Sequence, residues 1–232
     1  MSASERRGAT RTAVVWDALR PALEGSACNV LDIGGGTGGF AVRVAELGHR
    51  VTVVDPSPDA LAALDRRARE VGVQVTGVQG DVDGLADLAD RADVVLCHGV
   101  LEVVDDPATA LATIRRVLRA GGTLSLLLAQ RHAAVIARAM AGHFPQALAL
   151  LDGDPPSRSG HRFTVKEATG LLDAAGFEVT TVHGVRVFGD LVPGSLLDLE
   201  PGATAALVEL ERAVAERAEY LTLATQLHLL AR

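Results

Sequence analysis

The sequence predicts an α/β fold: a doubly wound, seven-stranded sheet with helices on both faces, mostly parallel but with one antiparallel strand. Over the first 130 residues, short apolar runs alternate with helical stretches, which is the pattern of consecutive βαβ units. Near the end, two strand-like runs over residues 177–188 and 221–230 flank a helix. This last pair would place an antiparallel strand in an otherwise parallel sheet.

Each element follows from its local pattern. Helices are expected to begin at Thr12, at Ser57 or Pro58 and at Pro107, and Gly48 and Gly176 are suitable C-terminal caps. The expected strands are 29–33, 51–54, 73–78, 93–97, 123–128, 177–188 and 221–230. The expected helices are 12–23, 40–47, 57–69, 107–120, 131–144, 165–175 and 203–218.

The chain is expected to form a single domain over residues 1–232. Its 232 residues are 48% hydrophobic and 22% charged, close to the globular average, which excludes wholesale disorder. The rhythm of elements changes after Gln130, and 152–159 is a loop rich in Pro, Gly, Asp and Ser. We therefore expect residues 131–164 to form a cap over the carboxyl edge of the sheet.

Charge and cysteine content narrow the function classes. The net charge of -7 weakens the case for a broad basic face that holds nucleic acid. Cys28 and Cys97 fit a reducing compartment, and their number and spacing fit neither a disulfide framework nor a zinc site. The first residues lack the apolar core of a signal peptide, and no apolar run approaches membrane-spanning length. We expect a cytoplasmic protein with no bound metal and no membrane contact.

The strongest motif follows the first strand. Asp32 precedes Gly34, Gly36 and Gly38, so the pattern is Asp-x-Gly-x-Gly-x-Gly. Glycines at such a turn allow positive φ and let a ligand touch the backbone. The spacing is neither that of a phosphate-binding loop with Gly-Lys-Ser/Thr nor that of a clean Gly-x-Gly-x-x-Gly fingerprint. An acid directly before the glycines would repel a pyrophosphate but suits a cationic ligand such as a sulfonium.

Asp55 ends the second strand, about twenty residues beyond the glycines. A carboxylate there can accept hydrogen bonds from the two ribose hydroxyls of a nucleoside. The alternative is that Asp55 caps the next helix, since Pro56, Ser57 and Pro58 follow it.

Two weaker signals follow the third and fourth strands. Asp81, Val82 and Asp83 could read an adenine edge, or the acids could cap a short turn. His98 leaves the apolar fourth strand at the edge where α/β sheets bind ligands, although a lone histidine is more often packed or capping.

Together these segments resemble class I S-adenosylmethionine-dependent methyltransferases, which have a Rossmann-like fold. Further segments are similar to one subfamily, the tRNA methyltransferases that esterify the carboxylate of 5-carboxymethoxyuridine at the wobble position. These segments are Arg11 with Trp16, His98–Glu102, Gln130–Phe144, Ala175–Phe177, Gly184–Asp190 and Leu221–Arg232.

The resemblance implies that S-adenosylmethionine is the cofactor and assigns residues to it. Arg11 would bind the carboxylate of the methionine moiety, which a planar guanidinium can grip bidentately, although a solvated arginine is the plain alternative. Gly34 and Gly35 would line that moiety, and Asp32 and Gly36 are also expected to bind the cofactor. Asp55 would hold the ribose, Asp81 and Val82 would border the adenine, and His98 would lie beside the cofactor.

Three departures concern the acceptor. Val103 stands where the subfamily has an aromatic residue, and Gly189 stands where it has a histidine. The loop from Leu151 to Gly160 is acidic where the subfamily has a run of lysines and arginines, and this opposes RNA affinity.

The acceptor's chemistry decides whether a base is needed. An ionised carboxylate needs none, and cationic groups would hold it; Arg186 is the first candidate, with Arg131, His132, His161 and Arg162. A hydroxyl or amine would need a base such as His98 or His132. No catalytic residue is therefore assigned. Methyl transfer to a tRNA carboxylate, methyl transfer to a small molecule and a non-catalytic binding module all stay open, and the sequence does not predict an oligomeric state.

Overall fold

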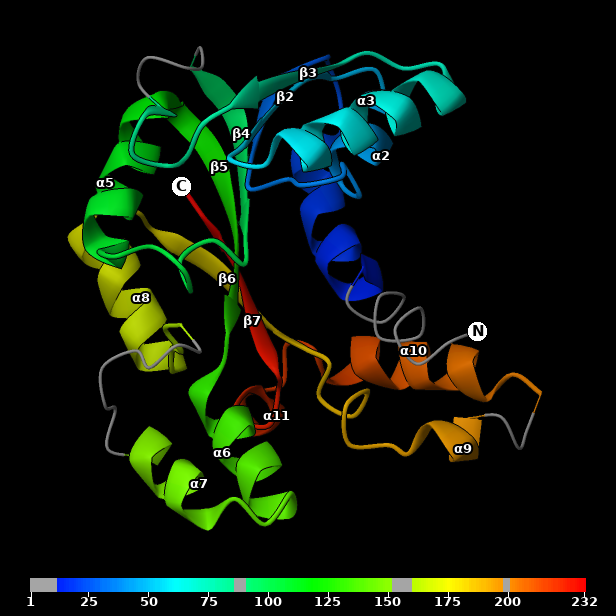
Figure 1. The fold of residues 1–232 in the computed structure, drawn as a ribbon, viewed down its shortest axis with the longest axis vertical. Helices are drawn as coiled ribbons and strands as arrows, with labels where there is room; N and C mark the ends of the chain where they lie inside the picture. Colours follow the sequence, from blue (N-terminus) through cyan, green and yellow to red (C-terminus); the bar gives the residue numbers. More distant parts are fainter. Residues whose placement is uncertain (1–11, 86–90, 152–159, 198–200) are drawn as a thin grey trace.

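The computed structural model describes residues 12–85, 91–151, 160–197 and 201–232. Its centre is a seven-stranded sheet with the order β3-β2-β1-β4-β5-β7-β6 (Figure 1). Strands β1 to β5 are parallel, whereas β7 runs antiparallel to both β5 and β6. The expected mixed, doubly wound sheet is confirmed. The strands are β1 (Asn29–Ile33), β2 (Arg50–Asp55), β3 (Val75–Gln79), β4 (Ala92–His98), β5 (Leu118–Ala129), β6 (Val179–Val185) and β7 (Gln226–Ala231).

Helices cover both faces of this sheet (Figure 1). A helix over residues 12–19 runs into the 3-10 helix η1 (Arg20–Leu23). The remaining helices are α2 (Ala41–Glu46), α3 (Pro58–Val71), α5 (Pro107–Val117), α6 (Arg131–Met140), α7 (Phe144–Leu151), α8 (Val165–Ala174), α9 (Gly194–Leu197), α10 (Ala203–Val214) and α11 (Ala218–Leu221).

Alternate residues of the central strands enter two separate cores. In β4, Val94 and Leu96 pack with the residues of α2 and α3, whereas Val95 and Cys97 pack with those of α5 and α8. Successive side chains of a strand point to opposite faces, so a strand buried on both sides is apolar throughout. This is why the parallel strands read as continuous apolar runs in the sequence.

The elements differ from the expected bounds at β5 and after it. The helix from Pro107 was expected to reach residue 120 and the strand to begin at residue 123, but β5 begins at Leu118. One helix was expected over 131–144, but Gly142 at φ 77° separates α6 from α7. The sixth strand ends at Val185 rather than at residue 188, because Arg186 adopts φ 57° and leaves the strand. The last strand begins at Gln226 rather than at residue 221, since the helical turn of α11 comes first.

Helices α6, α7 and α11 lie beyond the carboxyl ends of β4 and β5, and α9 and α10 lie to one side of them (Figure 1). Because β7 is antiparallel, its first residues meet the ends of β5 and β6 at this edge: Gln130 N–H donates to Thr225 O at 3.0 Å. No helix in the described part of the chain is long and apolar enough to cross a membrane.

Candidate functional site

The glycine turn after β1 has the backbone geometry that the motif predicts. Gly34, Gly36 and Gly38 have φ of 65°, 55° and 79°, a region that favours glycine. A Cβ on Gly34 would lie 2.7 Å from Val100 Cγ2, whereas a Cβ on Gly36 would have no neighbour nearer than 3.9 Å. The turn thus packs against Val100 on one side and opens beside Gly36 on the other, where a ligand can touch the backbone.

Asp55 faces this opening from the end of β2. Its Oδ2 accepts from Gly36 N–H and its Oδ1 from Ser57 N–H, both at 2.9 Å. Asp55 is 7% exposed. Ser57, not Asp55, caps α3, since its hydroxyl accepts from Ala60 N–H. A carboxylate has about four acceptor positions, so Asp55 keeps capacity for two ribose hydroxyls after binding the turn. The geometry fits a ribose-bearing cofactor.

Asp32 lies beneath the same turn and is 3% exposed. A Cβ on Gly35 would come within 2.5 Å of its Oδ2, so only glycine lets the backbone approach this carboxylate. Arg11, the expected partner of the cofactor's carboxylate, lies outside the described residues.

Asp81 and Val82 occupy a turn after β3. Asp81 Oδ1 accepts from the N–H groups of Asp83 and Gly84 at 3.1 and 3.3 Å, which is the capping role that was the alternative for this segment. Val82 is buried in the core with Leu85. Contact of these two residues with an adenine stays a prediction.

His98 ends β4 and starts a buried polar row across the sheet. Its Nε2 lies 2.9 Å from Ser125 Oγ, which lies 2.8 Å from His228 Nε2. Burial lowers the pKa of His228 well below its usual value, so this ring is neutral. The ring of Phe40 meets that of His98 edge-on at 5.0 Å. The contacts with Ser125 and Phe40 fix the orientation of the His98 ring, and Ser125 occupies its Nε2.

Arg131 and His132 begin α6. Arg131 Nη2 lies 2.8 Å from Glu167 Oε1 and donates to Arg162 O at 3.1 Å, so its guanidinium holds the segment that carries Arg162. His132 is exposed. Their contact with an acceptor stays a prediction.

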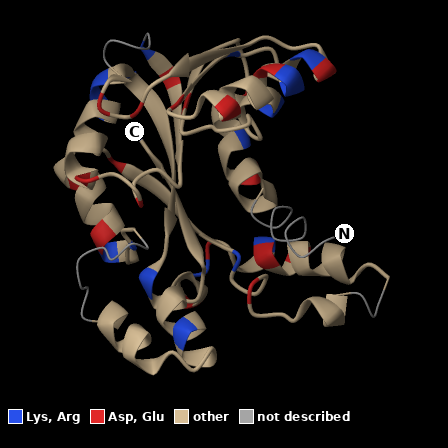
Figure 2. Ribbon diagram, viewed as in Figure 1, with Lys and Arg blue, Asp and Glu red and all other residues tan. Residues whose placement is uncertain are grey.

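A cavity of about 570 Å³ opens at the ends of β5, β6 and β7. One wall is α6, whose charged positions are arginines (blue in Figure 2) and whose alanines leave room. Burial and the neighbouring Arg138 lower the pKa of Arg162, and Glu102 opposes this shift. The lining residues are Gln130, Ala133, Ala134, Ile136, Ala137, Arg138, Met140, Ala141, Arg162, Arg186, Asp190, Leu191, Leu223 and Thr225.

Arg186 enters this cavity from a strained backbone position. It has φ 57°, unusual for a residue with a side chain, and its carbonyl accepts from Thr225 N–H and Oγ1–H at 3.3 and 3.1 Å. Its Nη2 lies 3.3 Å from Asp190 Oδ2, and its Nε is buried without a hydrogen-bond partner in the structure. A buried, unsatisfied donor at a cavity wall is a group poised for an anionic ligand.

Sequence reasoning missed three buried polar residues: Ser125, His228 and Glu211. All three are fully buried, and Glu211 binds the turn that follows Arg186. Glu211 did leave a signal, because it falls on the apolar stripe of its helix with Leu207 and Val214. Ser125 and His228 likewise left a signal, because each is a polar residue at a buried position of an otherwise apolar strand.

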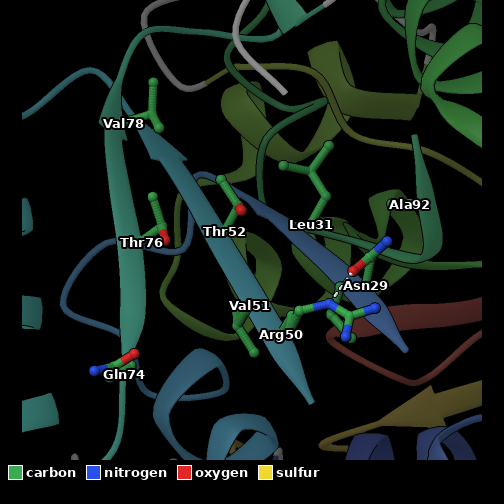
Figure 3. Close-up of a pocket in the computed structure, with 10 residues that line it drawn as sticks. Asn29, Leu31, Arg50, Val51, Thr52, Gln74, Thr76, Val78 and Ala92 are labelled. Atoms are coloured by element: carbon green, nitrogen blue, oxygen red, sulfur yellow. Dashed lines mark hydrogen bonds between the residues drawn. The ribbon is translucent and has the colours of Figure 1, made fainter. Parts of the chain in front are cut away.

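A second cavity, of about 550 Å³, lies over the first three strands of the sheet (Figure 3). It extends from the first residues of β1, β2 and β4 to Thr76 and Val78 of β3, and Arg50 Nε donates there to Asn29 Oδ1 at 2.7 Å. Ligands of open α/β sheets bind at the carboxyl ends of the strands, so this cavity is not the candidate site. Within the described ranges, no three His, Cys, Asp or Glu side chains are placed to hold a metal ion.

Comparison with known proteins agrees with this geometry. A family described as "Methyltransferase domain" matches residues 31–126, which contain the glycine turn, Asp55 and His98. The chain is 30% identical to the tRNA 5-carboxymethoxyuridine methyltransferase of Escherichia coli K12, over 97% of this chain and 89% of that protein. It is 36% identical to a ubiquinone biosynthesis O-methyltransferase of Xanthomonas axonopodis pv. citri, over 70% of this chain and 68% of that protein.

The fold has solved counterparts. The magnesium protoporphyrin IX methyltransferase of Synechocystis, solved with bound S-adenosylhomocysteine, superposes with a TM-score of 0.63 at 16% identity, covering 97% of this chain and 82% of that one. At this identity the likeness establishes the fold. The family assignment rests on the Escherichia coli relative, because its similarity spans 97% of this chain and includes both the glycine turn and the residues that line the 570 Å³ cavity. The chain belongs to the S-adenosylmethionine-dependent methyltransferases, and S-adenosylmethionine is its cofactor.

Proposed function

We propose that this methyltransferase esterifies a carboxylate, and that the acceptor is the carboxylate of a modified wobble uridine in tRNA. The observation that carries the first part is the charge of the 570 Å³ cavity at the carboxyl edge of the sheet. Among its described lining residues the ionisable ones are Arg138, Arg162, Arg186 and Asp190. Three of these groups are guanidiniums, and the fourth, the Asp190 carboxylate, is engaged by Arg186 Nη2 at 3.3 Å.

This set of residues suits an acceptor that is already anionic. A carboxylic acid of ordinary pKa is ionised at neutral pH, so its oxygen can attack without losing a proton. A phenol or amine would need a base near the reacting atom. His98 is engaged through Nε2 with Ser125, and His132 is exposed and does not line the cavity.

Each group then has a role. When bound, S-adenosylmethionine supplies an electrophilic methyl group on a sulfonium. Asp55 and the backbone of Gly34 to Gly36 hold the cofactor, while Arg186 and Arg162 hold the carboxylate. Arg131 acts by securing the Arg162 segment through Arg162 O. Aligning two bound reactants in this way is worth about 7–11 kcal/mol of barrier in favourable cases.

The Escherichia coli relative supports the second part of the proposal, the tRNA acceptor. The Escherichia coli protein is named for methylation of 5-carboxymethoxyuridine in tRNA, and its similarity spans nearly the whole chain. The cap proposed over residues 131–164 would lie on the acceptor side, which is supported by α6 lining the cavity. A protein that modifies tRNA would work in the cytoplasm, in keeping with the unpaired Cys28 and Cys97.

A small carboxylic acid is the second candidate acceptor. The observation that favours it is charge: the chain carries -7 overall, and its 151–160 segment is acidic. A tRNA-binding surface is expected to be basic.

The test uses methyl-labelled S-adenosylmethionine. We would incubate the protein with tRNA that carries 5-carboxymethoxyuridine, then with small carboxylic acids and phenols. Label in the tRNA that mild alkali releases would support the proposal, since esters hydrolyse under these conditions. Label in a small acid would select the second candidate. Alkali-stable label in a phenol, with none in carboxylates, would overturn the carboxylate acceptor.

A further inference from the structure

Glu211 of α10 is a buried acid whose two carboxylate oxygens accept three backbone hydrogen bonds. Its side chain is 0% exposed. Its Oε2 accepts from Val187 N–H at 2.8 Å, and its Oε1 accepts from Phe188 and Gly189 N–H at 2.9 and 2.7 Å. A buried carboxylate persists only when such donors replace water. The turn after β6 is therefore built around this one side chain.

That turn begins at Arg186, the residue with φ 57°. A left-handed conformation is unfavourable for a residue with a Cβ and persists only where its surroundings impose it. Glu211 restrains the three residues after Arg186, and Thr225 donates a hydrogen bond to the carbonyl of Arg186. The restrained backbone directs the arginine into the 570 Å³ cavity with its Nε buried and unbonded.

We propose that Glu211 is a positioning residue for the acceptor: it fixes the turn so that Arg186 presents Nε–H and an Nη–H to the acceptor's carboxylate. This inference rests on the proposed function, in which that carboxylate binds Arg186. The Nε and Nη2 edge of a guanidinium forms two parallel hydrogen bonds with a carboxylate, but only when the guanidinium is held in one orientation. Asp190, 3.3 Å from Nη2, helps to set that orientation.

Glu211→Gln isolates the effect. Glutamine keeps the shape of the side chain, but its amide has one oxygen and an NH2 group that donates. At least one of the three backbone N–H groups would then face a donor, and the turn would relax. Glu209→Gln is the matched control, because Glu209 lies on the same helix, is 71% exposed and contacts Arg212 rather than the turn.

The experiment measures methyl transfer to an anticodon stem-loop RNA carrying 5-carboxymethoxyuridine. We expect Glu211→Gln and Arg186→Gln each to raise KM for the RNA about tenfold, the loss of roughly one charge-assisted hydrogen bond. The double variant should be no worse than the poorer single variant, because both changes remove the same interaction. Affinity for S-adenosylhomocysteine should stay within twofold in all four proteins, and Glu209→Gln should match the wild type.

Two results would overturn the inference. One is an unchanged KM in Glu211→Gln; the other is a double variant whose defect is the product of the two single defects. A purely structural role would lower the melting temperature and the cofactor affinity together, without a specific change in KM.

Hydrogen exchange at Arg186 Nε–H, followed by NMR, gives a readout that needs no acceptor. We expect slow exchange in the wild type and exchange at least tenfold faster in Glu211→Gln, since a released arginine becomes exposed. Equal exchange in both proteins would also overturn the inference. If the wild type methylates no RNA, the proposed acceptor fails, and the exchange comparison still decides whether Glu211 positions Arg186.

Discussion

The two halves of the carboxyl edge are built on different principles. On the cofactor side, the groups expected to bind are the backbone of the glycine turn and Asp55, and both follow directly from the ends of β1 and β2. On the acceptor side, the groups are side chains held by residues far away in sequence. Glu211 binds the turn 22–24 residues earlier, and Gln130 Nε2 donates to Leu221 O, 91 residues later. A site made of local backbone can be read from a motif, whereas a site made of distant side chains requires the fold.

The largest expected effect lies in the acceptor half. Glu211→Ala removes the acceptor of three backbone N–H groups and leaves them buried. Unsatisfied buried donors cost about 1–3 kcal/mol each, so the free energy of unfolding should fall by about 3 kcal/mol or more. Urea unfolding of wild type and variant measures the difference. A loss below about 1 kcal/mol would mean that water replaces the carboxylate, and the contrast between the two halves would weaken.

The matching test in the cofactor half is Asp55→Ala. It removes a charged acceptor for the ribose and should weaken S-adenosylmethionine binding by roughly 1.5–3 kcal/mol, measured by calorimetry. Asp55→Asn keeps one acceptor oxygen and should lose less. Asp59→Ala, an exposed acid in the first turn of α3, is the control and should bind as the wild type does. Unchanged affinity in Asp55→Ala would restrict Asp55 to holding the glycine turn.

The same contrast explains what the sequence predicted. The sheet, its antiparallel strand and the first four strands followed from apolar periodicity and glycine positions, because those signals are local; the fifth strand was expected at 123–128 but begins at Leu118. The positive φ values of Gly34, Gly36 and Gly38 followed from the motif itself. The resemblance to methyltransferases added the cofactor, which the periodicity alone did not specify.

The acceptor half was predicted less well for a physical reason. Nothing local to Arg186 indicates a left-handed backbone; the conformation depends on Glu211, which arrives from another helix. The expected end of the sixth strand at residue 188 is therefore wrong, and β6 ends at Val185. Arg131 has the residue type of an anion-binding group, but only the fold shows that Glu167 engages it. Arg11 falls outside the described residues, so its role stays a prediction.

The pH dependence of stability should also arise in the acceptor half, where β6 and β7 carry His183 and His228. Burial lowers the pKa of both, with Glu216 opposing the shift at His183, so the folded state favours the neutral rings. The unfolded chain has a histidine pKa near 6.5 and binds protons first as pH falls. The free energy of unfolding should thus be highest above about pH 6.5 and decline below it, by up to about 1.4 kcal/mol per pH unit for each histidine.

Unfolding curves between pH 7.5 and 5.5 check this prediction. His228→Gln should show a shallower decline than the wild type, because one of the two histidines is removed and glutamine can still bond Ser125. Parallel slopes in the two proteins would show that His228 does not drive the pH dependence. They would place its origin elsewhere in the chain.

The smallest expected effect tests whether the left-handed backbone at Arg186 is strained. Gly is free to adopt φ 57°, whereas Ala retains the Cβ that makes this conformation unfavourable by about 1–2 kcal/mol. Arg186→Gly should therefore be more stable than Arg186→Ala by about 1 kcal/mol, after the extra entropy of glycine in the unfolded chain is counted. Both variants should bind the acceptor equally poorly, since both lack the guanidinium. If Ala proved as stable as Gly, the turn would relax freely without its arginine, and the backbone would hold no strain for Glu211 to impose. If Gly bound the acceptor as well as the wild type does, the cavity's recognition would belong to Arg162 and Arg138 instead.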